Sequence, residues 1–269
     1  MIRTFHLLAV LPLFLASALA EDTFLTVEDA GPDYALQGEY AGEIKVDGAS
    51  VQLGMQVIAL GDHKFDAVSY PGGLPGAGWT GEAKFKAHGE TKDDETRIVD
   101  DEHGHAILHD GKAVLYSKDG SELGTLKKVE RRSPTLGAKA PEGAIVLFDG
   151  TSADHFNGGK LTMKDLLAAD CETKEKFSDH KLHIEFRTPF KPAARGQARG
   201  NSGVYIQGRY ECQVLDSFGL EGENNECGGI YSIAKPNVNA CFPPLTWQTY
   251  DIDFTAARYE DGKKIKNAR

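Results

Sequence analysis

The stretch GNSGVYIQGRYECQVLDSFG at positions 200–219 decides the fold, because polar and apolar residues alternate there through two successive extended runs. In the second run, Glu211 and Gln213 fall on one side and Cys212 and Val214 on the other. A period of two residues is typical of a strand with one buried and one wet face. We therefore expect two neighbouring strands here, whose polar side chains point the same way.

The segment HIEFR at positions 183–187 repeats this alternation upstream, with Glu185 and Arg187 opposite apolar neighbours. An antiparallel sheet needs only one buried face, so the other carries solvated charge or a binding site. The glycines at 200, 203 and 208 favour a site, because glycine inside a strand often marks the close approach of a ligand. The pattern predicts that Glu185, Arg187, Glu211 and Gln213 share one polar sheet face.

The first 20 residues have the three-part layout of a secretory signal peptide. Arg3 is followed by an apolar run at 7–15 and then by Ala18-Leu-Ala20 before Glu21. We expect the chain to be exported and to be secreted or periplasmic. No other apolar run approaches the length that spans a membrane.

The composition excludes some classes of partner. The formal net charge is −10, so the chain has no general attraction for nucleic acid or anionic lipid. Its 30 glycines and its scarcity of long helical patterns favour β structure.

Turn signals and periodicity predict two domains. Residues 21–130 read as a small antiparallel β-rich domain, either a meander or a barrel, of unknown role. Residues 131–143 have two prolines and no apolar period, so they read as a linker. In the domain at 144–269, where periodicity alone predicts a β-sandwich, we expect a buried strand at 144–148 and a short helix at 162–169.

Four cysteines, at positions 171, 212, 227 and 241, allow three pairings in an exported protein. Cys227 and Cys241 bracket a loop with glycine and proline that is easy to close. A bridge between Cys171 and Cys212 stays open as an alternative.

Several ordered motifs in the second domain resemble those of the 3-keto-disaccharide hydrolase family. They are LFDGT at 147–151, EFR at 185–187, GNSGVYIQGRYE at 200–211, VLDSFG at 214–219, NECGGIY at 225–231 and PPLTWQTYDID at 243–253. The resemblance implies a concanavalin-like jelly roll that acts on sugars, and it implies the Cys227–Cys241 disulfide. The fold class expected for the whole chain is therefore all-β. The chain ends at Arg269 inside what resembles a family strand, so we expect the jelly roll to be C-terminally incomplete.

The activity implied by the resemblance is cleavage of 3-keto-glycosides or disaccharides by elimination and hydration. A ketone at carbon 3 acidifies the C2 proton, so a carboxylate base removes it while an acid protonates the leaving oxygen. Glu185 and Glu211 are the candidate base and acid. Arg187 or a divalent metal ion is the candidate partner of the enolate oxygen.

Five further residues are candidate sugar contacts: Asn201, Tyr205, Gln213, Asp216 and Trp247. Direct hydrolysis by two carboxylates is a second enzymatic route. Outside enzymes, the alternatives are a lectin-like carbohydrate-binding module without turnover, or an inactive fragment. No serine nucleophile elbow, dinucleotide-binding glycine pattern or zincin motif occurs in the sequence.

Overall fold

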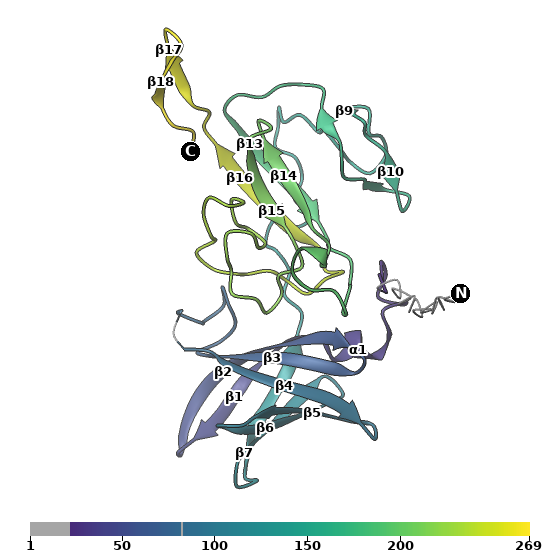
Figure 1. Cartoon of the computed structure of the whole chain (residues 1–269), viewed down its shortest axis with the longest axis vertical. Helices are drawn as coiled ribbons and strands as arrows, with labels where there is room; N and C mark the ends of the chain where they lie inside the picture. Colours follow the sequence, from purple (N-terminus) through teal and green to yellow (C-terminus); the bar gives the residue numbers. More distant parts are fainter. Residues whose placement is uncertain (1–21, 82) are drawn as a thin grey trace, which may run out of the picture.

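Two β-rich units follow one another along the chain (Figure 1), which is described by a computed structural model over residues 22–81 and 83–269. The predicted signal peptide lies outside the described residues. Within them, the helical elements are α1 (Gly31–Leu36) and the short 3₁₀ turn η1 (Gly196–Ala198). The predicted all-β fold class is therefore confirmed.

The first unit is a closed barrel of eight antiparallel strands in chain order. The strands are β1 (Gly38–Val46), β2 (Ala49–Gly61), β3 (Lys64–Pro71), β4 (Phe85–Lys92), β5 (Glu95–Asp100), β6 (Gly104–His109), β7 (Lys112–Ser117) and β8 (Glu122–Val129). Pairing of β1 with β8 closes the barrel, which removes the free strand edges that an open sheet exposes.

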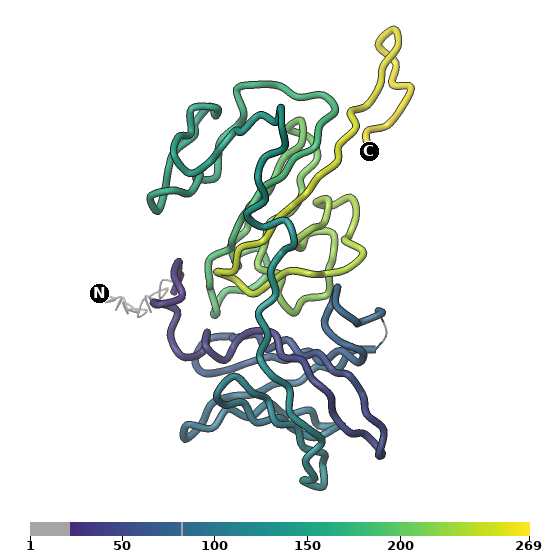
Figure 2. The backbone as a smooth tube through the Cα atoms, turned by 180° about the vertical axis from the view of Figure 1, so that it is seen from behind, coloured from purple at the N-terminus to yellow at the C-terminus, as the bar shows by residue number. Residues whose placement is uncertain are grey.

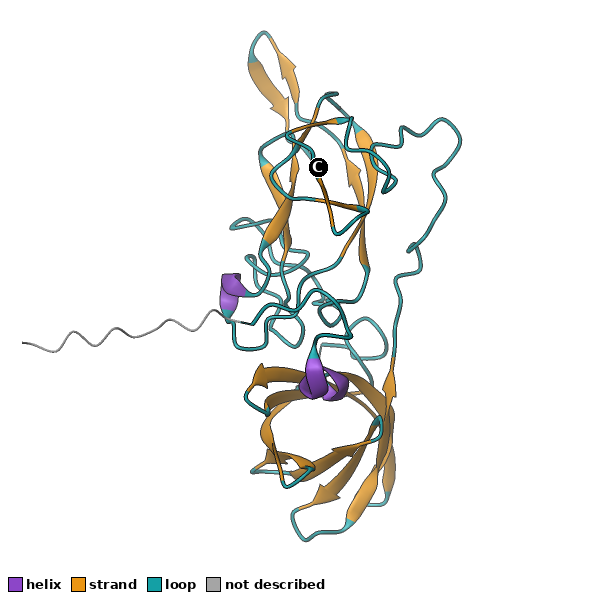
Figure 3. Cartoon of the chain, turned by 90° about the vertical axis from the view of Figure 1, so that its right-hand side faces the viewer, coloured by secondary structure: helices purple, strands orange, loops and turns teal. Residues whose placement is uncertain are grey.

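Tight turns and alternating burial explain why this sequence forms a barrel. The hairpins turn at Asp47-Gly48 and Asp110-Gly111, where both residues have positive φ, as two-residue hairpin loops of the favoured twist require. Large apolar side chains such as Tyr40 and Phe65 are 1% exposed and fill the interior. The helix α1 lies at one end of the barrel (Figure 3).

The second unit is built from two-stranded antiparallel sheets. Its strands are β9 (Phe156–Asn157), β10 (Leu161–Thr162), β11 (Leu166–Leu167), β12 (Glu172–Thr173), β13 (His180–Phe186), β14 (Ser202–Ile206), β15 (Tyr210–Val214), β16 (Gln248–Phe254), β17 (Arg258–Glu260) and β18 (Lys263–Lys266). The pairs that matter for the site are β13 with β16 and β14 with β15.

Two local predictions in this unit are wrong. Residues 144–148 form no strand, and Ile145 is 55% exposed, because no described segment pairs with this run. Residues 162–169 form no helix but the β10–β11 hairpin, which turns at Met163 and Lys164 with positive φ at both residues. A helix cannot continue through left-handed backbone, so the local turn overrides the apolar pattern.

The β13–β16 pair and the β14–β15 pair face each other through their apolar sides. Ile206 of β14 and Phe254 of β16 lie in one buried cluster, against which Leu182, Val204 and Tyr210 pack. Since successive side chains in a strand point to opposite faces, the polar side chains of the two pairs must point away from each other. This arrangement decides where the candidate site residues lie.

The core continues between the two units. Phe190 of the second unit is fully buried in the barrel's apolar cluster, and its backbone exchanges two hydrogen bonds with Phe24. Phe218 packs in the same way against Ile58 and Tyr70 of the barrel. Figure 2 shows the 131–143 connection rising from the barrel along the second unit.

Candidate functional site

The polar face of the β14–β15 hairpin carries a tyrosine and a carboxylate side by side. Tyr205 and Glu211 are register partners, and the Tyr205 hydroxyl donates a 2.7 Å hydrogen bond to Glu211 Oε2. The pKa of Tyr205 is raised above its ordinary value, chiefly by this hydrogen bond, so the phenol keeps its proton at neutral pH. The Tyr205 side chain is exposed, so a ligand can reach the pair from solvent.

Side-chain amides surround this carboxylate. Gln213, which is fully buried, lies 2.8 Å from the amide of Gln197. Gln197 also accepts a hydrogen bond from Asn201 and donates one to the Asn225 carbonyl at 2.9 Å. The amides therefore form one connected network along the hairpin.

The orientation of the Gln213 amide links this network to the carboxylate. With the Gln213 amide turned by 180°, its nitrogen donates to Glu211 Oε1 at 3.2 Å and to the Ser202 carbonyl at 3.0 Å, and its oxygen faces the Gln197 amide, which must turn with it. Glu211 then accepts from both Tyr205 and Gln213. We call Tyr205, Glu211 and the amides of Gln197, Asn201 and Gln213 the Glu211 face.

Asp216 lies behind this face, in the protein interior. It is fully buried, and its Oδ2 accepts hydrogen bonds from Arg199 Nη2 at 2.5 Å and Nε at 3.1 Å. Burial raises the pKa of this carboxyl, while the Arg199 guanidinium opposes the shift. The prediction that Asp216 contacts substrate is therefore wrong, because the ion pair holds it out of reach.

Glu185 lies on the other sheet, on the outer face of β13–β16. Its Oε1 accepts a 2.5 Å hydrogen bond from the Gly137 backbone N–H. The prediction that Glu185 and Glu211 share one face is wrong, because their strands belong to different pairs whose apolar sides meet. The 131–143 segment thus already contacts the Glu185 carboxylate.

A histidine and an aspartate extend the outer face of β13–β16. His183 Nδ1 lies 2.7 Å from Asp251 Oδ1, and His183 Nε2 lies 3.4 Å from Glu185 Oε1. Thr135 of the 131–143 segment donates to Asp251 Oδ2 at 2.6 Å. The pKa of His183 is raised, chiefly by its hydrogen bond to Asp251.

Arg187 and Trp247 belong to this outer face as well. The Arg187 guanidinium lies 5.5 Å from the centre of the Trp247 ring, within the range of a cation–π contact. The predicted residues therefore divide into two groups. Glu211, Tyr205, Gln213 and Asn201 come together on one sheet, while Glu185, Arg187 and Trp247 come together on the other.

Cys227 and Cys241 are both buried, and both are free thiols in this structure. The expected disulfide is not formed; Cys227 Sγ lies 3.1 Å from the Tyr250 hydroxyl oxygen, and Cys241 Sγ donates to the Leu215 carbonyl at 3.6 Å. The neighbouring Cys241 lowers the pKa of Cys227, whereas the neighbouring Cys227 and burial raise the pKa of Cys241. Cys171 and Cys212 are free as well, so the alternative bridge is not formed either.

Two further features bear on function, namely metal-ligating clusters and membrane-spanning helices. Within residues 22–81 and 83–269, no group of three or more His, Cys, Asp or Glu side chains is placed to hold a metal ion. No helix in the same ranges is long and apolar enough to cross a membrane.

Sequence reasoning missed the residues that complete each face. Gln197 comes from the turn η1, which breaks the strand period, so alternation gave no sign of it. Asn225 contributes a backbone carbonyl, which no side-chain pattern reveals. Asp251 does lie in the alternating run at 248–254, and this alternation is the signal that was available.

The comparisons with known proteins agree with the motifs. Residues 143–265 match a family described as the 3-keto-alpha-glucoside-1,2-lyase-like domain. A candidate glycosyl hydrolase from Parabacteroides distasonis ATCC 8503, of known crystal structure, is 31% identical over 48% of this chain and 60% of its own, with a TM-score of 0.43. The chain thus spans 60% of that protein's length, and no curated protein matches. The resemblance to the 3-keto-disaccharide hydrolase family is confirmed for residues 143–265.

Proposed function

We propose that the second unit cleaves the glycosidic bond of 3-keto sugars by elimination followed by hydration, with Glu211 as the base. The match of residues 143–265 to a lyase-like domain supports a carbohydrate-cleaving, glycoside hydrolase-like function. The observation that carries the finer proposal is the exposed pair in which Tyr205 donates to Glu211. It supplies one base and one proton donor within reach of a single bound sugar.

The proposed steps use these two side chains. Glu211 removes the C2 proton, and the electron pair moves onto the ketone oxygen at C3 to give an enolate. Collapse of the enolate forms the C1–C2 double bond and breaks the bond from C1 to the glycosidic oxygen. The Tyr205 hydroxyl protonates that leaving oxygen. Water then adds its oxygen at C1, returning one proton to Tyr205, while Glu211, whose carboxyl proton has exchanged with solvent, protonates C2.

The enolate oxygen needs hydrogen-bond donors in this scheme. Arg187, the residue first considered for this role, lies on the other sheet beside Trp247. The amide of Asn201 is exposed at the edge of the Glu211 face and takes that place in our proposal.

Direct hydrolysis by Glu185 and Glu211 does not fit this geometry. Glycosidases place two carboxyl groups about 5–9.5 Å apart on either side of the scissile bond. Here the two side chains stand on the outer faces of sheets whose apolar sides meet. One sugar bond cannot lie between them.

We also propose that the chain is exported and that Cys227 and Cys241 form a disulfide after export. The layout of residues 1–20 supports export. Both residues lie beside the 215–217 segment, since the Cys227 N–H donates to Ser217 Oγ at 2.9 Å and Cys241 Sγ donates to the Leu215 carbonyl at 3.6 Å, and this supports the bridge.

Turnover in deuterated water tests the proposed function. The substrate is a 3-keto-glucoside, and C2 of the released keto sugar is examined for deuterium by NMR as the aglycone is released. Elimination predicts release of the aglycone and incorporation of deuterium at C2 of the product. Release without deuterium at C2 would rule out the elimination route, since direct hydrolysis leaves that hydrogen untouched.

A sugar-binding module without turnover is the second candidate, favoured by the exposure of Tyr205 and Tyr231 beside the Glu211 face. Exposed tyrosines present flat apolar surface with a polar end, which suits sugar binding. The same deuterium experiment separates the two, because a binding module gives saturable binding of the sugar and neither release nor exchange.

A further inference from the structure

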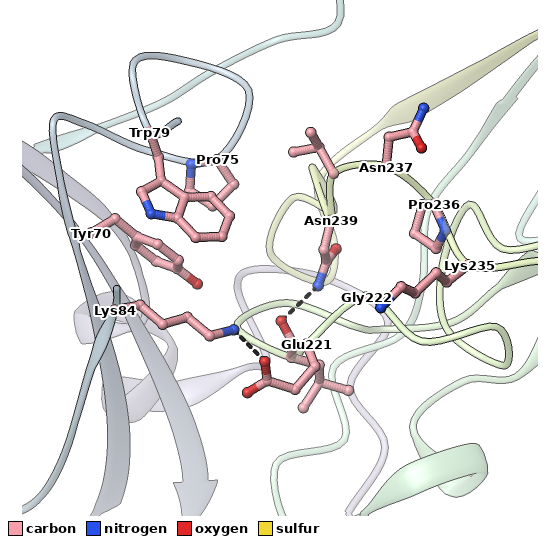
Figure 4. Close-up of a pocket in the computed structure, with 12 residues that line it drawn as sticks. Tyr70, Pro75, Trp79, Lys84, Glu221, Gly222, Lys235, Pro236, Asn237 and Asn239 are labelled. Atoms are coloured by element: carbon pink, nitrogen blue, oxygen red, sulfur yellow. Dashed lines mark hydrogen bonds and ion pairs between the residues drawn. The ribbon is translucent and has the colours of Figure 1, made fainter. Parts of the chain in front are cut away.

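A cavity of about 120 Å³ lies where the barrel meets the second unit. The barrel unit contributes Trp79 and Lys84, and the second unit contributes Glu221, Lys235 and Pro236. Figure 4 shows Trp79 and Pro236 on facing sides of the cavity, with the Lys84–Glu221 ion pair along its edge. This cavity could not be predicted from the sequence, because its walls come from segments about 140 residues apart.

The aromatic side of the cavity is held rigidly. The Trp79 ring packs edge-on against Tyr70, with ring centres 5.1 Å apart and planes at 67°. Tyr70 is 2% exposed and donates its hydroxyl proton to Gln56 at 2.9 Å. A ligand therefore meets an indole surface whose position is fixed by the barrel core.

The polar side of the cavity carries charged groups that are able to donate hydrogen bonds to, or accept them from, the hydroxyls of a ligand. Glu221 accepts from Lys84 at 2.6 Å and from Lys86 at 2.7 Å, and these contacts lower the pKa of its carboxyl. The carboxylate is thus ionised at neutral pH and has further lone pairs to offer. Lys235 adds a second ammonium donor on the opposite wall.

We propose that this cavity binds a single saccharide ring, stacked on Trp79 and hydrogen-bonded through Glu221, Lys84 and Lys235. A sugar ring has an apolar C–H face and a hydroxyl edge, which match the two sides described above. The cavity is open to solvent, and its 120 Å³, about four waters at ~30 Å³ each, takes the C–H face and one hydroxyl edge of a single ring while the rest of the ring stays in solvent. Ligands of drug or nucleotide size usually need about 300 Å³ or more.

One loop, residues 219–241, contacts both the cavity and the Glu211 face. Gly222 and Asn239 of this loop line the cavity, whereas the Asn225 carbonyl accepts from Gln197 of the Glu211 face at 2.9 Å. The barrel unit, through Trp79 and Lys84, thereby takes part in sugar binding. This binding stands independently of the proposed turnover, because it occurs at a different place.

Tryptophan fluorescence offers a direct test, since Trp79 and Trp247 are the two tryptophans of the sequence. In a Trp247→Phe protein, Trp79 alone reports. We expect saturable changes in Trp79 fluorescence with glucose, galactose, glucuronate or galacturonate. Comparing the two neutral sugars, glucose and galactose, with the two acidic sugars, glucuronate and galacturonate, shows which kind the cavity prefers. In the matched Trp79→Phe protein, where Trp247 alone reports, we expect no such change.

Calorimetric titration needs no tryptophan reporter, so each substitution is tested alone in the otherwise unaltered protein. Misfolding of the single-tryptophan variants then does not affect the result. Trp79→Ala should weaken binding at least about tenfold, whereas the distant Tyr259→Ala, on exposed β17, should leave it unchanged. Absence of saturable binding of all four sugars up to tens of millimolar, in a protein that melts cooperatively, would overturn the proposal. Equal binding by Trp79→Ala would overturn it as well.

Discussion

The carboxylate of Glu211 occupies the space that a side chain at Gly203 would take. A Cβ built at Gly203 would clash with Glu211 Oε1, and the next nearest atoms are also in that side chain. Gly203 lies on β14 beside Tyr205, on the same polar face. The missing side chain therefore lets Glu211 lie flat across the hairpin, where Tyr205 reaches it.

Gly203→Ala should move the Glu211 carboxylate and reduce turnover with little loss of stability. The clash falls on the free end of a flexible side chain, so we expect less than about 1 kcal/mol of destabilisation. A displacement of about 1 Å at a reacting group costs roughly 10²-fold in rate. Both effects are measured by 3-keto-glucoside cleavage and by urea unfolding. The control is the double variant that combines Gly203→Ala with Glu211→Gln. If it cleaves more slowly than Glu211→Gln alone, the glycine acts through another group.

Arg131→Met should destabilise the protein strongly, because it leaves a buried carboxylate unpaired. Glu39 in the barrel is 2% exposed, and Arg131 donates to its two oxygens at 2.6 and 2.5 Å. Removing one partner of a buried ion pair costs about 3–5 kcal/mol. Urea denaturation measures the loss. The control is Arg132→Met at the exposed neighbour, which should lower the free energy of unfolding by less than about 0.5 kcal/mol. Equal losses of unfolding free energy in the two variants would contradict the view that Arg131 neutralises Glu39.

The contact between the 131–143 segment and β13–β16 should weaken at high pH. The pKa of His183 is raised in the folded state, chiefly by Asp251, and Glu185 faces its other nitrogen. A raised folded-state pKa means that protonated His183 stabilises the fold fully below the unfolded value of about 6.5. That stabilisation is lost as the pH rises through the folded value. Hydrogen exchange at Thr135 and Gly137, corrected for intrinsic rates, should therefore quicken above neutrality, and His183→Gln should abolish that change.

Export should link Cys227 to Cys241. Closing a loop of this size stabilises the folded state by about 3 kcal/mol in the chain-entropy model. Non-reducing peptide mapping of the exported protein should find one cross-linked peptide that contains both residues, together with an N-terminus at Glu21. Recovery of both thiols alkylated without prior reduction would exclude the bridge.

The strand periods could be predicted from the sequence because they are local. Alternation at 200–219 and 183–187 predicted β13, β14 and β15, and turn signals with periodicity predicted an antiparallel β-rich unit at 21–130. The pairing of strands is not local. Nothing in either alternating run says that β13 pairs with β16 and β14 with β15, and this partition separates Glu185 from Glu211.

Burial and contacts between units also lay beyond the sequence. Asp216 follows directly after β15 and reads as one more polar residue, yet its pairing with Arg199 takes it inside. The contact of Gly137 with Glu185 depends on the path of a segment without any period. The Trp79 cavity depends on how the two units meet.

The rates of 3-keto-glucoside cleavage by Glu211→Gln and Glu185→Gln test the central claim most directly. Loss of a general base lowers the rate about 10²- to 10⁴-fold, so Glu211→Gln should show that loss with an unchanged melting temperature. Glu185→Gln, on the other sheet, should stay within about twofold of the unaltered protein, since it has no transition-state contact to lose. Undiminished cleavage by Glu211→Gln, or equal losses in both variants, would contradict the assignment of the Glu211 face as the catalytic site.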